Sequence, residues 1–258
     1  MQKTVVIDCF PESISLYRKG YAVVAVDVIR ATTTAVTAVA LGRRCFPVSS
    51  TDAAFALAAK LDHPLLVGEL GGDVPQGFEM NNSPALLVRR ADLARPVILL
   101  SSSGSKLIEA AGGCEARYLA CFRNFASVAN HLLRHPRVAV LGARSRGEFR
   151  EEDQMCCAWI AGRLLEEGYQ AENQETTDIV DRWRGVPPSA CADGHSALYL
   201  KRTGQAEDLD FVLTRINDLD AVCSVRDGEV VMAASESAEA GGLPVAVSGA
   251  GPRPIVSA

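Results

Sequence analysis

Four apolar segments of this chain are each followed directly by carboxylates, arginines, hydroxyl residues or glycines. The stretch VVAVDVIRATTT shows this most clearly, because Asp27, Arg30 and three threonines succeed an uncharged apolar run. The later segments lead into GELGGDVPQGFEMNNSP (68–84), SSSGSK (101–106) and GARSRGEFREED (142–153). Arginine binds phosphate and carboxylate oxygens in a fork, and Asp and Glu supply the oxygen ligands that Mg²⁺ accepts. These residue types therefore suit a site for a metal ion and a small anion.

The apolar segments and the stretches between them predict the elements that position these residues. Strands are expected at 4–8, 22–27, 64–68, 96–101 and 137–142. Each is apolar on consecutive positions, which is typical of strands covered on both faces. Helices are expected at 32–41, 51–61, 105–111, 124–134 and 151–167, and several end at a glycine or before a proline. This alternation predicts an α/β fold with three layers, α/β/α, around a mostly parallel or mixed sheet.

The chain follows a looser pattern after residue 170. It predicts helices at 195–204 and 206–216 and a β-hairpin that turns at Asp227–Gly228. We expect residues 1–170 to form the main α/β core that carries the motifs. Residues 171–233 are expected to complete the same fold, and the stretch 234–258, rich in Ala, Gly, Ser and Pro, to be a flexible tail.

The four polar strand ends predict one shared crevice, because ligands of open α/β sheets bind outside the carboxyl ends of the strands. We assign Asp27, Glu69 and Asp153 as candidate Mg²⁺ ligands. Asp27, Arg30, Glu152 and Asp153 are the candidate catalytic residues. Adjacent helical residues point about 100° apart. We therefore expect one of Glu152 and Asp153 to face the site and the other to cap the helix or pair with an arginine.

Composition excludes several classes of protein. The chain has 258 residues, 22% charged residues and a net charge of −5, which argues against a nucleic-acid binder. No apolar run is long enough to span a membrane, and the N-terminal run meets Asp8 too early for a secretory signal. The eight cysteines include no CxxC pair, so we expect reduced, packed thiols in a cytoplasmic protein. A homo-oligomer is compatible with this composition.

Three familiar motifs occur only in part. SSSGSK lacks the first glycine of a nucleotide-binding P-loop, and no Ser or Thr follows its lysine. A phospho-aspartate phosphatase needs a second aspartate two positions after Asp27, where Ile29 stands. His131 and His135 have the i, i+4 spacing of a zinc site, but their context favours the end of a helix. None of these chemistries is predicted.

The chain resembles the 2-phosphosulfolactate phosphatase family, also called ComB, in the order of DVIRATTT (27–34), GELGGDVPQGFEMNNSP (68–84), SSSGS (101–105), FRNFASVA (122–129) and GEFREEDQMCCA (147–158). The resemblance implies an α/β fold, Mg²⁺ dependence and hydrolysis of phosphosulfolactate to sulfolactate and phosphate. That reaction is a step of sulfonate metabolism towards coenzyme M. Together, the motifs and the resemblance predict ten substrate-binding residues: Thr32, Thr33, Asn82, Ser83, Ser102, Ser103, Gly104, Ser105, Asn124 and Arg144.

The chain departs from the family pattern at two positions. Ser103 replaces an asparagine, and Phe125 follows Asn124 where the family has alanine. We therefore expect a phosphatase for a small anionic phosphate ester, with 2-phosphosulfolactate as the first candidate. A phosphatase for a carboxylate analogue and a non-catalytic binding protein for an anionic metabolite are the alternatives. The expected partner is the small substrate, with neither nucleic acid nor membrane.

Overall fold

A ten-stranded mixed sheet is the centre of the protein in a computed structural model that describes residues 2–9, 11–145 and 148–233. The strand order is β10-β1-β7-β2-β6-β11-β12-β3-β5-β4. The strands are β1 (Thr4–Asp8), β2 (Ala22–Val26), β3 (Cys45–Val48), β4 (Leu65–Gly68), β5 (Val97–Leu100), β6 (Ala116–Ala120), β7 (Arg137–Gly142), β10 (Gln170–Ala171), β11 (Cys223–Arg226) and β12 (Glu229–Met232). A small separate pair consists of β8 (Arg144–Ser145) and β9 (Glu148–Phe149).

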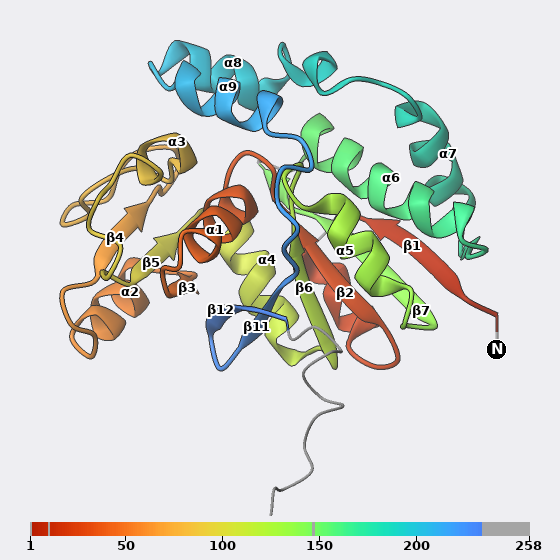
Figure 1. The fold of residues 1–258 in the computed structure, drawn as a ribbon, viewed down its shortest axis with the longest axis horizontal. Coiled ribbons are helices and arrows are strands. Elements are labelled where there is room, and N and C mark those ends of the chain that lie inside the picture. Colours follow the sequence, from red (N-terminus) through yellow and green to blue (C-terminus); the bar gives the residue numbers. More distant parts are fainter. Residues whose placement is uncertain (1, 10, 146–147, 234–258) are drawn as a thin grey trace, which may run out of the picture.

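Helices cover both faces of the sheet (Figure 1). The helices in the described part of the chain are α1 (Ala31–Ala40), α2 (Thr51–Ala58), α3 (Pro84–Leu87), α4 (Gly104–Ala110), α5 (Phe125–Leu132), α6 (Glu151–Glu166), α7 (Gln174–Trp183), α8 (His195–Arg202) and α9 (Ala206–Thr214). Successive residues of β2 enter different cores. Val24 packs with the cluster of α5, α6 and α7, and Val23 packs with the cluster of α1 and α4. The predicted three-layer α/β/α fold is confirmed.

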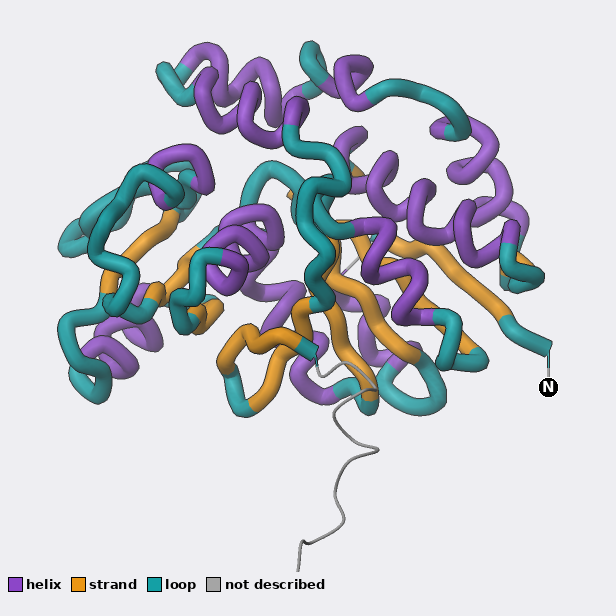
Figure 2. The backbone as a smooth tube through the Cα atoms, viewed as in Figure 1, coloured by secondary structure: helices purple, strands orange, loops and turns teal. Residues whose placement is uncertain are grey.

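The β11–β12 hairpin makes the sheet mixed. All other neighbouring strands of the large sheet pair in parallel, whereas β11 runs antiparallel to β6 and β12 antiparallel to β3. The hairpin turns at Asp227–Gly228, as predicted, and both residues have positive φ angles, 51° and 79°. The hairpin thus joins two parallel blocks, so residues after 170 are part of the central sheet (Figure 2).

The predicted elements were found within three residues of their expected bounds. Several elements were missed, among them β3, β6, α3 and α7. The polar stretch after residue 171 does contain a helix, α7, which Asn173 caps by accepting a hydrogen bond from Thr176 N. Its buried residues Thr176, Ile179, Val180 and Trp183 recur at helical spacing. The predicted tail at 234–258 lies outside the described residues.

Helices α8 and α9 pack against each other at the end of the sheet where α1 and α6 begin (Figure 1). Ala197, Leu200 and Leu209 form their shared core, and Ile29 packs against it. Ile29 lies in the loop after β2, so this small core attaches the helix pair directly above a polar strand end. We call α8 the cap.

All eight cysteines are free and buried, as expected for packed thiols. Burial raises the pKa of the Cys121 thiol to about 11, which keeps it protonated at neutral pH. No helix within the described ranges combines the length and apolar character that crossing a bilayer requires.

Candidate active site

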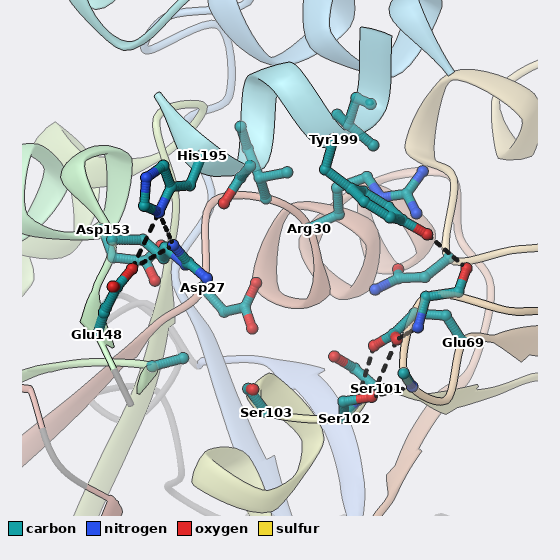
Figure 3. A pocket seen from close by; sticks show the side chains of 18 of the residues that line it. Asp27, Arg30, Glu69, Ser101, Ser102, Ser103, Glu148, Asp153, His195 and Tyr199 are labelled. Atoms are coloured by element: carbon teal, nitrogen blue, oxygen red, sulfur yellow. Dashed lines mark hydrogen bonds and ion pairs between the residues drawn. The ribbon is translucent and has the colours of Figure 1, made fainter. Parts of the chain in front are cut away.

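A cavity of about 780 Å³ lies between the carboxyl ends of the parallel strands and the cap (Figure 3). Its floor consists of the residues that follow β2, β4 and β5 and those that open α6. The floor side chains that line it are Asp27, Arg30, Glu69, Asn82, Ser101, Ser102, Ser103 and Asp153. Four separate strand ends therefore do meet at one polar cavity, as the sequence predicted.

Asp27 is held rigidly at the end of β2. Its Oδ1 accepts a hydrogen bond from Ala31 N at 2.9 Å, and its own N–H donates to Thr32 Oγ1 at 3.0 Å. Gly104 packs so closely that a Cβ there would overlap the Asp27 carboxylate and the side chain of Ala31. Asp27 thus holds the first backbone N–H of α1 and also lines the cavity.

Asp153 lies beside Asp27, although the two residues belong to different elements. Its Oδ1 accepts a hydrogen bond from Val28 N at 2.7 Å, which ties the first turn of α6 to the loop after β2. Asp153 lines the cavity, whereas Glu152 is 1% exposed and lies behind it. Glu152 Oε1 has no hydrogen-bond partner among the described residues. Of Glu152 and Asp153, Asp153 is therefore the one that faces the cavity.

The acids raise one another's pKa values. Burial raises the pKa of Asp27 to about 7, and the nearby charges of Glu69 and Glu152 contribute. Burial also raises the pKa of Asp153 well above its usual value, with further increases from Asp27 and Glu152. For Glu152, burial raises the pKa while a hydrogen bond from Ser196 opposes it. A bound cation would offset the free-energy cost of burying these negative charges close together.

Asp27 and Asp153 fit a magnesium ion with few protein ligands. Each carboxylate uses Oδ1 on a backbone N–H, and its Oδ2 accepts no hydrogen bond from any described residue. The described residues include no cluster of three His, Cys, Asp or Glu arranged around one metal position. Mg²⁺ commonly uses one or two carboxylates and completes its shell with water and substrate phosphate oxygens. The pair therefore matches that mode of binding.

Glu69 organises a loop next to this pair. Its carboxylate accepts hydrogen bonds from Ser102 N at 2.7 Å, Ser102 Oγ at 2.9 Å and Gly72 N at 2.8 Å. Gly71 N in turn donates to Ser102 Oγ at 2.7 Å. These three donors show that Glu69 joins the loop after β4 to the turn after β5, and its assignment as a Mg²⁺ ligand stays a prediction.

Arg30 is fixed by a buried ion pair with Asp208 of α9, and both side chains are 4% exposed. Asp208 also accepts hydrogen bonds from Ser83 Oγ at 2.7 Å and Ala85 N at 3.0 Å. Arg30 Nη2 donates to Asn81 Oδ1 at 3.0 Å. These contacts join the loop after β2, the start of α3 and α9, so they position both the guanidinium and the helix that supports the cap.

Most of the predicted substrate-binding residues lie outside the cavity. Thr32 and Thr33 instead hold the backbone of a strand end, because their hydroxyls donate to the carbonyls of Asp27 and Val28 at 2.7 Å. Asn124 similarly accepts from Cys121 N and donates to Leu119 O and Ala221 O. Seven of the ten residues therefore do not line the cavity, namely Thr32, Thr33, Ser83, Gly104, Ser105, Asn124 and Arg144, while Asn82, Ser102 and Ser103 do.

Arg144 is exposed on β8 and is not among the lining residues. Arg146 lies outside the described residues. Arg150, which follows the same hairpin, is the arginine that lines the cavity from this segment. The position of Arg150 directly before the acids of α6 could have indicated it as a site residue from the sequence.

The cap contributes residues that the sequence did not indicate. His195, Ser196, Tyr199 and Arg202 of α8 line the cavity from above. Tyr199 Oη donates to Gly72 O at 2.9 Å, so the cap touches the floor loop after β4. Gly72 has φ +104°, and a Cβ there would overlap the Tyr199 ring. Only the helical pattern of α8 was visible in the sequence, because its polar residues follow no strand.

The fold and the cavity together define an α/β enzyme-type site for a small anion, with paired buried acids and arginines at the strand ends. The chain belongs to the 2-phosphosulpholactate phosphatase family, whose sequence model matches residues 9–228. It is therefore a member of a family of phosphoric monoester hydrolases.

Individual relatives agree with this family. A protein named probable 2-phosphosulfolactate phosphatase from Carboxydothermus hydrogenoformans is 30% identical over 219 residues, covering 83% of this chain and 91% of that protein. A protein of the same name from Pseudothermotoga lettingae is 34% identical over 154 residues, covering 60% of this chain and 66% of that protein. A third, from Clostridium perfringens, is 28% identical and covers 82% and 89%.

Proposed function

We propose that this protein is a Mg²⁺-dependent phosphatase that hydrolyses 2-phosphosulfolactate to sulfolactate and phosphate. The observation that carries the proposal is the Asp27–Asp153 pair, in which two buried carboxylates from different elements face one cavity. Family membership supports the phosphatase chemistry, and the names of the relatives support the substrate. A role in sulfonate metabolism towards coenzyme M and a cytoplasmic location are part of the same proposal.

Asp27 and Asp153 would hold the metal ion. When bound, Mg²⁺ supplies polarisation of the phosphoryl oxygens and a lowered pKa for its bound water. Backbone hydrogen bonds fix both carboxylates, so little reorganisation is needed when the substrate enters. Arg30 has five N–H donors, and its partners Asp208 and Asn81 leave some of them for the substrate.

A phosphatase for a carboxylate analogue is the second candidate, and Ser103 favours it. The structure places Ser103 in the lining of the cavity, at the position where the family pattern has an asparagine. A serine hydroxyl is shorter than an amide and offers one donor rather than two. The change therefore alters which acid group the turn after β5 accepts. Phospholactate, which lacks the sulfonate, is the simplest substrate of this kind.

A panel of phosphate esters tests the proposal. Release of inorganic phosphate is measured from 2-phosphosulfolactate, 2-phospholactate and glycerol 2-phosphate, each with Mg²⁺ and with EDTA. We expect kcat/KM to be highest for 2-phosphosulfolactate and EDTA to abolish release. Equal rates in Mg²⁺ and EDTA would exclude the metal dependence. No release from any ester would contradict the phosphatase activity and favour a binding protein.

A further inference from the structure

Three polar side chains form a triangle at the rim of the cavity, outside the mechanism described above. Arg150 Nη1 lies 2.9 Å from Glu148 Oε2 and 2.7 Å from His195 Nδ1. His195 Nδ1 also lies 2.9 Å from Glu148 Oε2 (Figure 3). All three residues line the cavity. We call this group the rim triangle.

The rim triangle leaves one contact unsatisfied in every protonation state of His195. If Nδ1 accepts a hydrogen bond from Arg150, the same lone pair also faces the negative charge of Glu148. If Nδ1 carries a proton and donates to Glu148, it has no lone pair left to accept from the N–H of Arg150. One nitrogen cannot accept from Arg150 and donate to Glu148 at once. An acid group with several oxygens removes this conflict, because separate oxygens accept from Arg150 and from His195.

Arg150 is the fixed member of the rim triangle, and Glu148 is the exchangeable one. The Arg150 side chain is 11% exposed, and its Nε is buried without a hydrogen-bond partner among the described residues. A buried N–H without an acceptor is destabilising. The Glu148 side chain is 58% exposed, so it can turn into water, and exposed ion pairs contribute little to stability. An incoming anion can therefore replace Glu148 at Arg150 Nη1.

The rim triangle lies close enough to Asp27 and Asp153 for one small substrate to contact both groups. Arg150 precedes Asp153 by three residues at the start of α6, and residues at this spacing are neighbours on a helix surface. Its charge lowers the pKa of Asp153, in partial opposition to burial. A three-carbon ester that places its phosphoryl group at Asp27 and Asp153 can therefore place a second acid group at Arg150.

We propose that Arg150 and His195 bind the acid group of the substrate that is not transferred, a sulfonate or a carboxylate, and that Glu148 occupies this subsite until the substrate displaces it. The inference rests on the proposed function, because it takes the substrate to be a phosphate ester with a further acid group. It makes the rim triangle the place where the enzyme distinguishes multiply anionic esters from simple ones. It also gives Glu148 the role of an internal competitor.

The test is the affinity for sulfolactate, measured by calorimetry with Mg²⁺ present. Glu148→Gln removes the competing charge, so we expect binding about fivefold tighter than in the wild type. Glu207→Gln is the matched control, because Glu207 pairs with Arg89 at 2.9 Å, is 62% exposed and does not line the cavity. This control should bind sulfolactate as the wild type does. Arg150→Lys keeps the charge but loses the fork, and should weaken binding about tenfold.

The opposite sign of the Glu148→Gln effect would overturn the inference. If the rim triangle only fastens the cap, Glu148→Gln loosens α8 and binding weakens; unchanged binding overturns the inference equally. Hydrolysis of two esters gives the second readout: in Glu148→Gln the KM for 2-phosphosulfolactate should fall more than the KM for glycerol 2-phosphate, because only the former carries the acid group that displaces Glu148. Absence of phosphate release by the wild type would count against the proposed function alone, since sulfolactate binding is measured without turnover.

Discussion

The floor and the cap of the cavity are built in different ways. The floor places Asp27 and Asp153 at the junctions of strands and helices, where backbone N–H groups hold both carboxylates in a buried setting. The cap presents His195 at 70% exposed and reaches the floor through a few polar side-chain contacts. Rigid backbone contacts suit groups that must meet a metal ion and a phosphoryl group precisely. Side-chain contacts suit groups that select the substrate and can exchange partners.

The largest expected effect separates Asp153 from its neighbour Glu152 in the first turn of α6. Asp153→Asn should lower kcat by roughly 10³-fold, because the neutral amide no longer attracts a cation while it still accepts from Val28 N. Glu152→Gln should stay within about tenfold of wild-type kcat, because Glu152 lies behind the cavity lining. The measurement is phosphate release from 2-phosphosulfolactate with Mg²⁺. A larger loss in Glu152→Gln would reverse the two roles.

The next effect concerns the support of the cap. Asp208→Asn breaks the buried pair with Arg30 and leaves a buried charge, so we expect a loss of about 3–5 kcal/mol in the free energy of unfolding. Urea denaturation measures it. Glu207→Gln on the same helix removes an exposed ion pair and should cost about 1 kcal/mol or less. Equal losses in the two variants would show that the Arg30–Asp208 pair does not anchor α9.

The smallest effect tests the contact between the cap and the floor. Tyr199→Phe removes the hydrogen bond to Gly72 O, worth about 1 kcal/mol, and should raise KM about fivefold with kcat unchanged. Tyr21→Phe is the control, because Tyr21 donates to Glu172, and neither residue lines the cavity. Steady-state kinetics gives kcat and KM for both variants. A fall in kcat with constant KM would mean that Tyr199 acts on the chemical step.

The sequence predicted the floor better than the cap for a physical reason. Consecutive apolar residues mark buried strands, and the topology of such sheets brings the residues after each strand to one edge. That reasoning located Asp27, Asp153 and Glu69. The motifs and the family resemblance also assigned Thr32 and Asn124 to the substrate, because residue types do not show whether a polar group bonds the ligand or the backbone.

The cap could not be predicted because it depends on long-range contacts. His195 and Tyr199 occupy positions on an ordinary amphipathic helix, and their place above the cavity results from packing on Ile29 and α9. The partner of Arg30 likewise lies 178 residues away, at Asp208. No local pattern encodes either relation.

The Asp27→Asn variant tests the central claim most directly. The substituted amide keeps an oxygen that can accept from Ala31 N, so the fold should persist, while the negative charge that the paired acids offer to Mg²⁺ is lost. Phosphate release from 2-phosphosulfolactate at saturating Mg²⁺ is measured beside the unfolding midpoint. We expect kcat to fall by roughly 10³-fold with an unchanged midpoint. A folded Asp27→Asn protein with nearly normal kcat would contradict the assignment of Asp27 and Asp153 as the metal-binding pair.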